Sequence, residues 1–120
     1  ALATREKLLG SEHPETATSL NNMALLYAHM KQYDRAEPLF QRALKVMENT
    51  YGPEHPETAG CLHNLANLSV IQGKYELARS FYQRAMAIRE QVLGSEHPHT
   101  RMLWEDYGTL RELTGQFDDI

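Results

Sequence analysis

The sequence is poor in the residues that mark several classes of protein. A single cysteine, Cys61, allows no disulfide within the chain, which is typical of a reducing, intracellular setting. Five prolines and seven glycines in 120 residues are too few for a disordered or collagen-like chain. No apolar run, Met23–Ala28 included, approaches the roughly 20 residues that cross a bilayer.

Positive charge is also scarce. Twelve Lys and Arg stand against 16 Asp and Glu, so the formal net charge is −4. A chain of this charge has no electrostatic attraction to nucleic acid or to anionic lipid. We therefore expect an intracellular, cytoplasmic protein that binds neither nucleic acid nor membranes.

The chain repeats itself with a period of 42 residues. The segments Gly10–Thr16, Gly52–Thr58 and Gly94–Thr100 each contain Glu-His-Pro and end in threonine. Residues 10–51 and 52–93 are identical at 17 of 42 positions, spread over the whole unit. Because the length is about 2.9 periods, we expect a piece of a longer solenoid. The expected division is 1–9 as the end of a preceding second helix, 10–51 and 52–93 as full repeats, and 94–120 as a partial repeat.

Each unit contains the residues that typically mark the starts and ends of two helices. Gly52 and Gly94 follow helical runs and suit the left-handed backbone just past a helix end. Apolar residues then recur at spacings of three and four on both sides of a short polar break, which indicates two amphipathic helices. Asp34 followed by Glu37 predicts a capping box at the start of the second helix. No segment shows the alternation of apolar and polar residues that is typical of a β-strand, so we predict an all-α fold.

The apolar positions of both helices resemble those of the tetratricopeptide repeat, in which small and aromatic residues recur at set places. The first unit carries Leu20, Met23, Ala24, Tyr27, Ala36, Phe40 and Ala43 at these places. The second carries Leu62, Leu65, Ala66, Ala78, Tyr82 and Ala85, and the third Trp104, Tyr107 and Gly108. The 42-residue length and the Gly-x-x-His-Pro-x-Thr linker are similar to kinesin light chain and nephrocystin-3-like repeats. The resemblance implies a right-handed α-solenoid of antiparallel helix pairs, whose first helices line a concave groove.

The family role that this resemblance implies is a protein-interaction module or scaffold, not an enzyme, with no cofactor. Such a module binds a peptide or partner helix in its groove, and an Asn amide offers a donor and an acceptor to a peptide backbone. Asn22, Asn64 and Asp106 are each 42 residues apart and would form a polar ladder. The alternative is that these amides bond neighbouring helices. The groove contacts expected by family analogy are Asn21, Asn22, Leu25, His29, His63, Asn64, Asn67, Glu105 and Asp106.

Charge placement refines the expected partner. Only Arg101 and Arg111 among the basic residues fall within the three first helices, whereas others, including Arg89, belong to second helices. The groove should therefore lack the basic cluster with which related chaperone-binding repeats hold a C-terminal carboxylate. It should also differ from the basic grooves of kinesin light chains. A neutral peptide, or a basic one that meets the acids of the third first helix, fits better, although these acids also suit an ordinary solvated face. The acids are Glu105, Asp106 and Glu112.

Histidine and cysteine support only minor alternatives. His13, His55 and His97 lie one repeat apart and cannot converge as the three or four ligands of a metal site. We therefore expect linker packing and helix capping, with His97 and His99 as a weak surface metal site in the less favoured metal or enzyme hypothesis. Cys61 has no basic neighbour in sequence to activate it and is expected to pack as a small residue.

The incomplete third unit suggests a structural alternative. Trp104, Tyr107 and Leu110 lie on a first helix that no complete second helix follows. We expect an exposed apolar patch there that another copy of the chain covers. The chain would then be a self-associating segment of a longer repeat array.

Overall fold

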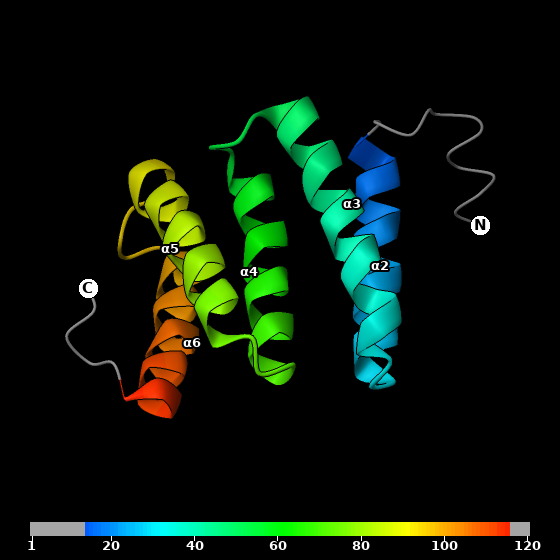
Figure 1. Cartoon of the computed structure of the whole chain (residues 1–120). Helices are drawn as coiled ribbons and strands as arrows, with labels where there is room; N and C mark the ends of the chain where they lie inside the picture. Colours follow the sequence, from blue (N-terminus) through cyan, green and yellow to red (C-terminus); the bar gives the residue numbers. More distant parts are fainter. Residues whose placement is uncertain (1–13, 116–120) are drawn as a thin grey trace.

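The computed structural model describes residues 14–115, which form helices and no strand. The chain passes back and forth through one row of helices, from the α2–α3 pair past α4 to the α5–α6 end (Figure 1). The predicted all-α fold of antiparallel helix pairs is confirmed. The helices are α2 (Pro14–His29), α3 (Tyr33–Tyr51), α4 (Pro56–Ile71), α5 (Tyr75–Val92) and α6 (Pro98–Thr114).

The His-Pro linker sets the start of the first helices. Histidines 55 and 97 have extended backbones, as a residue before proline prefers, and the prolines that follow open α4 and α6. The His55 Nδ1 atom accepts a hydrogen bond from the backbone N–H of Glu57 at 3.0 Å, and His97 accepts one from His99 at 3.1 Å. The capping role predicted for these two histidines is confirmed. His13 lies outside the described residues.

The glycine and the threonine of the linker also have structural roles. Gly52 and Gly94 have φ angles of 98° and 89°, which only glycine adopts without strain, so the chain can turn there. Thr58 is fully buried and its hydroxyl donates to the Gly52 carbonyl at 2.7 Å. The linker therefore ties each first helix to the end of the preceding second helix.

The capping box predicted at the start of α3 is wrong. The helix begins at Tyr33, and the residue before it, Gln32, makes no side-chain cap. Asp34 thus lies inside the first turn of α3, where its negative charge interacts favourably with the positive end of the helix dipole. It does not occupy the N-cap position. Glu37 instead joins the two repeats, because its carboxylate accepts from Gln72 and from Lys74, each at 3.4 Å.

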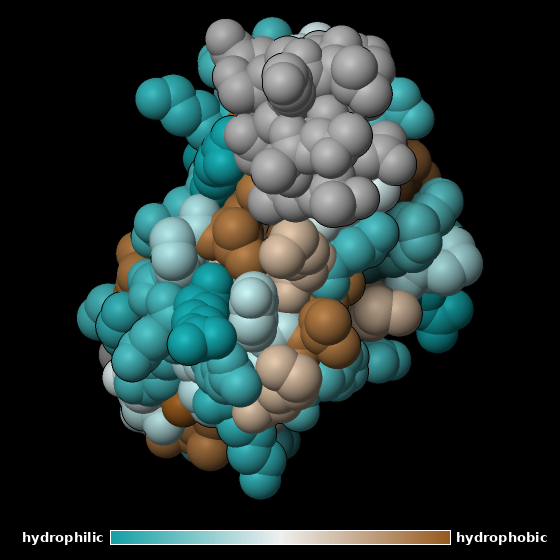
Figure 2. All heavy atoms as spheres, turned by 90° about the vertical axis from the view of Figure 1, so that its right-hand side faces the viewer, coloured by the Kyte–Doolittle hydropathy of each residue, from teal (hydrophilic) through white to brown (hydrophobic). Residues whose placement is uncertain are grey.

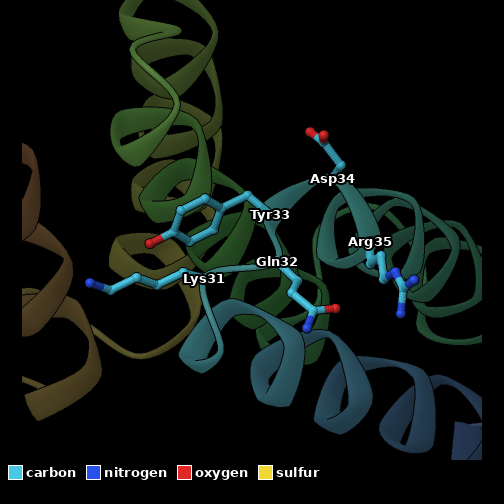
Figure 3. A pocket seen from close by; sticks show the side chains of 5 residues that line it. All are labelled: Lys31, Gln32, Tyr33, Asp34 and Arg35. Carbon is cyan, nitrogen blue, oxygen red and sulfur yellow. The ribbon is translucent and has the colours of Figure 1, made fainter.

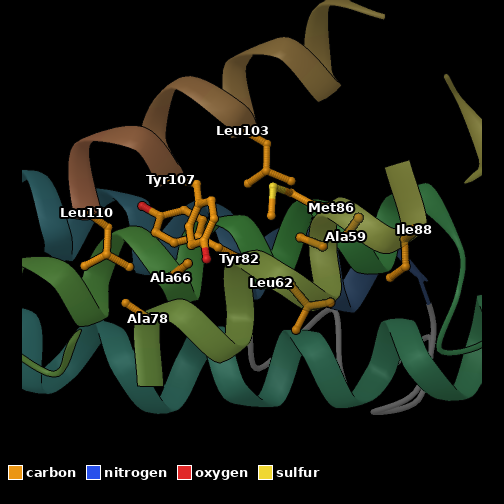
Figure 4. Close-up of a cluster of buried hydrophobic side chains, with 11 residues drawn as sticks. Ala59, Leu62, Ala66, Ala78, Tyr82, Met86, Ile88, Leu103, Tyr107 and Leu110 are labelled. Atoms are coloured by element: carbon orange, nitrogen blue, oxygen red, sulfur yellow. The ribbon is translucent and has the colours of Figure 1, made fainter. Parts of the chain in front are cut away.

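Small residues bring the helices of a pair together. Ala66 of α4 and Ala85 of α5 are fully buried in one core cluster, and such small side chains allow neighbouring helix backbones to approach closely. Tyr82 of α5 and Tyr107 of α6 fill the space beside them, with ring centroids 5.9 Å apart (Figure 4). One core therefore runs from α4 through α5 to α6.

The exposed patch predicted on α6 is also wrong. Tyr107 and Leu110 are only 1% and 2% exposed, because they pack on α5, the second helix that precedes them. Trp104 is half-buried against the same cluster, and its indole N–H donates to Glu90 at 2.7 Å. A first helix buries this stripe against the preceding second helix, so a following helix is not needed to cover it.

An exposed apolar face lies instead at the other end of the described chain, on α2. Leu26 is 58% exposed, whereas its counterparts Leu68 and Leu110 are 3% and 2% exposed. Leu68 packs with Phe40 of α3, and Leu110 packs on α5 in the same manner. Met30 lies one turn beyond Leu26 and is 48% exposed. Figure 2 shows this end of the molecule, where hydrophobic side chains lie among polar ones.

Candidate functional site

The first helices α2, α4 and α6 are joined by a hydrogen bond that recurs from repeat to repeat. The Asn64 Nδ2 atom donates to Asn21 Oδ1 at 3.1 Å, and the His63 Nε2 atom lies 2.6 Å from Asp106 Oδ2. Asn21 and His63 occupy the same repeat position, and Asn64 and Asp106 occupy the next one. Each first helix is therefore hydrogen-bonded to the next first helix by residues at equivalent repeat positions.

These hydrogen bonds between helices change the interpretation of the polar ladder predicted from Asn22, Asn64 and Asp106. Asn64 and Asp106 each bond a neighbouring helix, which is the alternative left open by the sequence. Asn22, the first member, is exposed on α2. A ligand that uses Asn64 must share or displace its bond to Asn21.

His63 is the centre of a wider network. The Arg89 Nη1 atom lies 3.0 Å from His63 Nδ1, and it also donates to the His99 carbonyl at 3.0 Å. Because a guanidinium only donates, Nδ1 is the acceptor and the protonated Nε2 donates to Asp106. Burial lowers the pKa of His63, and the charge of Arg89 lowers it further, against the opposing effect of Asp106. The result is a neutral imidazole that joins α4, α5 and α6.

Sequence reasoning missed the position of Arg89. The residue belongs to second helix α5, as predicted, but it is only 7% exposed and its side chain reaches the first helices. Burial lowers its pKa while Asp106 raises it, and a guanidinium keeps its proton in such a site. Its place in the apolar stripe of α5, where the first repeat has Met47, was the available sign. The groove wall thus contains a cation that the sequence had assigned to the outer helices.

Two cavities open along the first helices. The larger, about 400 Å³, spans α2, α4 and α6 near their N-terminal ends and includes the His63–Arg89 pair. The smaller, about 210 Å³, lies between α2 and α4 nearer their C-terminal ends. Residues of the larger cavity are Thr18, Asn21, Met47, Pro56, Glu57, Gly60, Cys61, His63, Asn64, Arg89, His99 and Met102. Residues of the smaller are Leu25, Ala28, His29, Phe40, Asn64, Asn67, Leu68 and Ile71.

The smaller cavity is apolar with a polar edge. Phe40 and Leu68 are almost fully buried, whereas Ile71 is 56% exposed. The Tyr82 hydroxyl donates to Oδ1 of the Asn67 side chain, which holds that amide in place from α5. The cavity therefore combines an apolar surface that is open to solvent with a fixed amide.

The predicted groove residues separate into two groups in the structure. Those that line a cavity are Asn21, Leu25, His29, His63, Asn64 and Asn67. Those that line neither cavity are Asn22, Glu105 and Asp106. Glu105 and Glu112 are exposed on α6, while Asp106 is partly buried by its bond to His63.

Two other features of the described residues have structural explanations. A hollow of about 440 Å³ is formed by residues 31–35, at the turn that leads into α3, but their side chains spread in different directions and do not converge (Figure 3). Cys61 is 3% exposed, and burial, with Glu57 and Glu48, raises the pKa of its thiol to about 12. The packing role predicted for Cys61 is confirmed.

Residues 14–115 contain no group of three or more His, Cys, Asp or Glu that could hold a metal ion. The rings of His97 and His99 lie 4.9 Å apart, and His97 Nδ1 is engaged in capping α6. Within the same range, no helix combines the length and the apolar character needed to cross a membrane.

Comparison with solved structures identifies the fold. The BtubC (BKLC) protein of P. vanneervenii superposes with a TM-score of 0.89 at 24% identity, over 97% of this chain and 46% of that one. A Podosopora anserina protein, described as having kinesin light chain nearly identical TPR-like repeats, gives 0.87 at 27% identity, over 96% and 55%. The chain thus spans about half the length of these proteins and resembles kinesin light chain repeats.

Curated relatives match over a shorter stretch. The clustered mitochondria protein homolog of Emericella nidulans is 38% identical over 42 residues, which is 35% of this chain and 3% of that protein. The homolog from Aspergillus niger is 36% identical over the same length. A match of one repeat length carries no information about the activity of the whole protein.

Two family models of the tetratricopeptide repeat match the chain, one over residues 18–70 and the other over 58–99. Together they cover residues 18–99. This range includes the whole of α3, α4 and α5, and the hydrogen bond between Asn21 and Asn64. The chain belongs to the tetratricopeptide repeat family.

Proposed function

We propose that this chain binds an extended peptide or a partner helix along α2, α4 and α6. Tetratricopeptide repeats are in general protein-interaction scaffolds, and their folds are in general non-enzymatic. The observation that carries the proposal is the pair of adjacent cavities, about 400 and 210 Å³, which open on the first helices. We also propose that the chain is not an enzyme and that it acts in the cytoplasm.

The side chains around the two cavities suit a peptide ligand. Asn64 lines both cavities, so it lies where a bound chain would pass from one to the other. Amide groups bond a peptide backbone, each at about 0.5–1.5 kcal/mol, and the apolar surface beside Leu25 adds burial. Several such contacts together give a specific but reversible interaction.

The test combines affinity capture with hydrogen exchange. The chain is immobilised, captured proteins are identified, and their binding segments are mapped as synthetic peptides. Bound peptide should slow amide exchange in α2 and α4 more than on the outer side of α3. Replacing Asn22 and Asn64 together by Ala should weaken binding, and the loss of the Asn64–Asn21 hydrogen bond should lower the free energy of unfolding by only about 0.5–1.5 kcal/mol. Protection confined to α3 and α5 would contradict groove binding.

A second candidate function, a structural segment that stacks on other repeats, is favoured by the exposed face of α2. Leu26 and Met30 are open where Leu68 and Leu110 are covered by a second helix. A patch of this kind suits stacking with another repeat or another copy. Sedimentation velocity over a range of concentrations distinguishes the two functions, because a groove binder alone stays monomeric.

A further inference from the structure

The smaller cavity, between α2 and α4, points to the chemistry of the segment that this chain binds. At about 210 Å³ it is below the roughly 300–1,000 Å³ typical of small-molecule sites, and it is open to solvent. Its wall is made by Leu25, Ala28 and Ile71 above a base of Phe40 and Leu68. A space of this size and lining suits one large apolar side chain.

The cavity does not depend on side chains that would have to move. Phe40 and Leu68 belong to the core cluster of α3 and α4 and are 1% and 3% exposed. The amide of Asn67 is held by the Tyr82 hydroxyl. A partner side chain therefore meets a preformed surface, which lowers the ordering cost of binding.

The charges around the cavity select the neighbours of that apolar residue. Helices α2 and α4 contain no Lys or Arg at all, and their acids are Glu15 and Glu57. Helix α6 adds exposed carboxylates at Glu105 and Glu112, and Arg89 is already bonded to His63 and the His99 carbonyl. Arg101 is the only exposed cation on these three helices within the described residues, whereas Lys31 and Lys74 are exposed in the turns that follow α2 and α4. Lys74 is paired with Glu37 at 3.4 Å. The exposed charge of the first helices is therefore mainly negative, which favours a basic peptide over an acidic one.

We propose that the partner is an extended segment with one large aliphatic or aromatic side chain, flanked by Lys or Arg. The apolar side chain occupies the cavity between α2 and α4, and the basic residue faces Glu105 or Glu112 on α6. Packed helix axes are about 10 Å apart, so α6 lies about 15 Å from the middle of the α2–α4 gap, and two or three extended residues together with a Lys or Arg side chain span this distance. This inference rests on the proposed function and defines the ligand of that same groove.

The test uses a phage-displayed library of random short peptides, selected on the full chain and measured by fluorescence anisotropy. Selected peptides should share Leu, Ile, Met or Phe with Lys or Arg two or three residues away. Ile71→Asn should weaken them about tenfold, because it puts a polar amide on the apolar wall of the cavity without adding a charge. Leu26→Asn is the matched control, since Leu26 is equally exposed but lines neither cavity, and the affinity of this variant should stay within about twofold of the wild type. The double variant Glu105→Lys/Glu112→Lys should weaken basic peptides and spare neutral ones.

The outcomes separate this inference from the proposed function. Peptides that bind the Ile71→Asn variant as well as the wild type, or that are rich in Asp and Glu, overturn the inference. If hydrogen exchange still protects α2 and α4 in that case, groove binding stands. A library that yields no peptide for the wild-type chain counts against groove binding and against the inference with it.

Discussion

Leucine occurs at the same position of the three repeats, as Leu26, Leu68 and Leu110. Replacing each by Ala tests directly whether a first helix buries this position against the second helix that precedes it. The three side chains are chemically identical, and they differ only in how far neighbouring helices bury them. Leu68 and Leu110 are 3% and 2% exposed under α3 and α5, whereas Leu26 is 58% exposed on the outer face of α2. The difference in stability loss therefore reports on packing alone.

The expected losses follow from the buried area. Leu→Ala removes three carbons at about 0.8 kcal/mol each, and the cavity left in a packed core brings the total to about 2–5 kcal/mol. We expect Leu68→Ala and Leu110→Ala to lose about 3 kcal/mol each. Leu26 buries only about two-fifths of its surface, so Leu26→Ala should lose at most about 1 kcal/mol.

Urea unfolding followed by far-ultraviolet circular dichroism measures these losses. The wild-type chain and the three variants are compared at low and at high protein concentration. A Leu26→Ala loss equal to that of Leu68→Ala at low concentration would refute the assignment of an open face on α2. A Leu26→Ala loss that appears only at high concentration would instead support stacking between copies.

Three further predictions concern buried polar groups. The pKa of His63 is lowered by folding, so the unfolded chain takes up the proton first, and stability should fall as pH drops below about 6.5. Each unit between the two pKa values removes about 1.4 kcal/mol, and this part of the pH dependence should vanish in His63→Asn, as measured by urea unfolding between about pH 5.5 and 8. Cys61, with a pKa raised to about 12, should resist a thiol reagent in native buffer and react on unfolding, whereas fast native labelling would contradict its burial. Tyr82→Phe removes the hydroxyl that donates to Asn67 and should cost about 0.5–1.5 kcal/mol in thermal or urea unfolding, with an unchanged midpoint as the contrary result.

Much of the fold could be predicted because the sequence repeats. The glycine, the His-Pro pair and the threonine of each linker mark helix ends by local backbone chemistry, and the structure shows Gly52, His55 and Thr58 in these roles. The capping box at Asp34 was wrong because the helix starts two residues earlier than that box requires, with Gln32 at the cap position and Tyr33 as the first helical residue. Such a shift depends on how α3 packs, which local sequence does not specify.

The candidate site could be predicted only in part. Family analogy named residues such as Leu25 and Asn67, which do line a cavity. It could not anticipate that Asn64 bonds Asn21, or that Arg89 reaches His63 from α5. These contacts join residues on different helices, and their partners depend on the relative shift and tilt of the helices.

The sequence by itself determined the period, the helix pairs and the family, because these depend on spacings of three and four and on turn residues within one unit. Only the tertiary structure decided which polar side chains are used between helices and which apolar ones remain open. The stripe with Tyr107 is covered by α5, while the equivalent face around Leu26 is not. The physical reason is that a first helix buries this stripe against the second helix that precedes it, so burial depends on a neighbouring repeat and not on the residue.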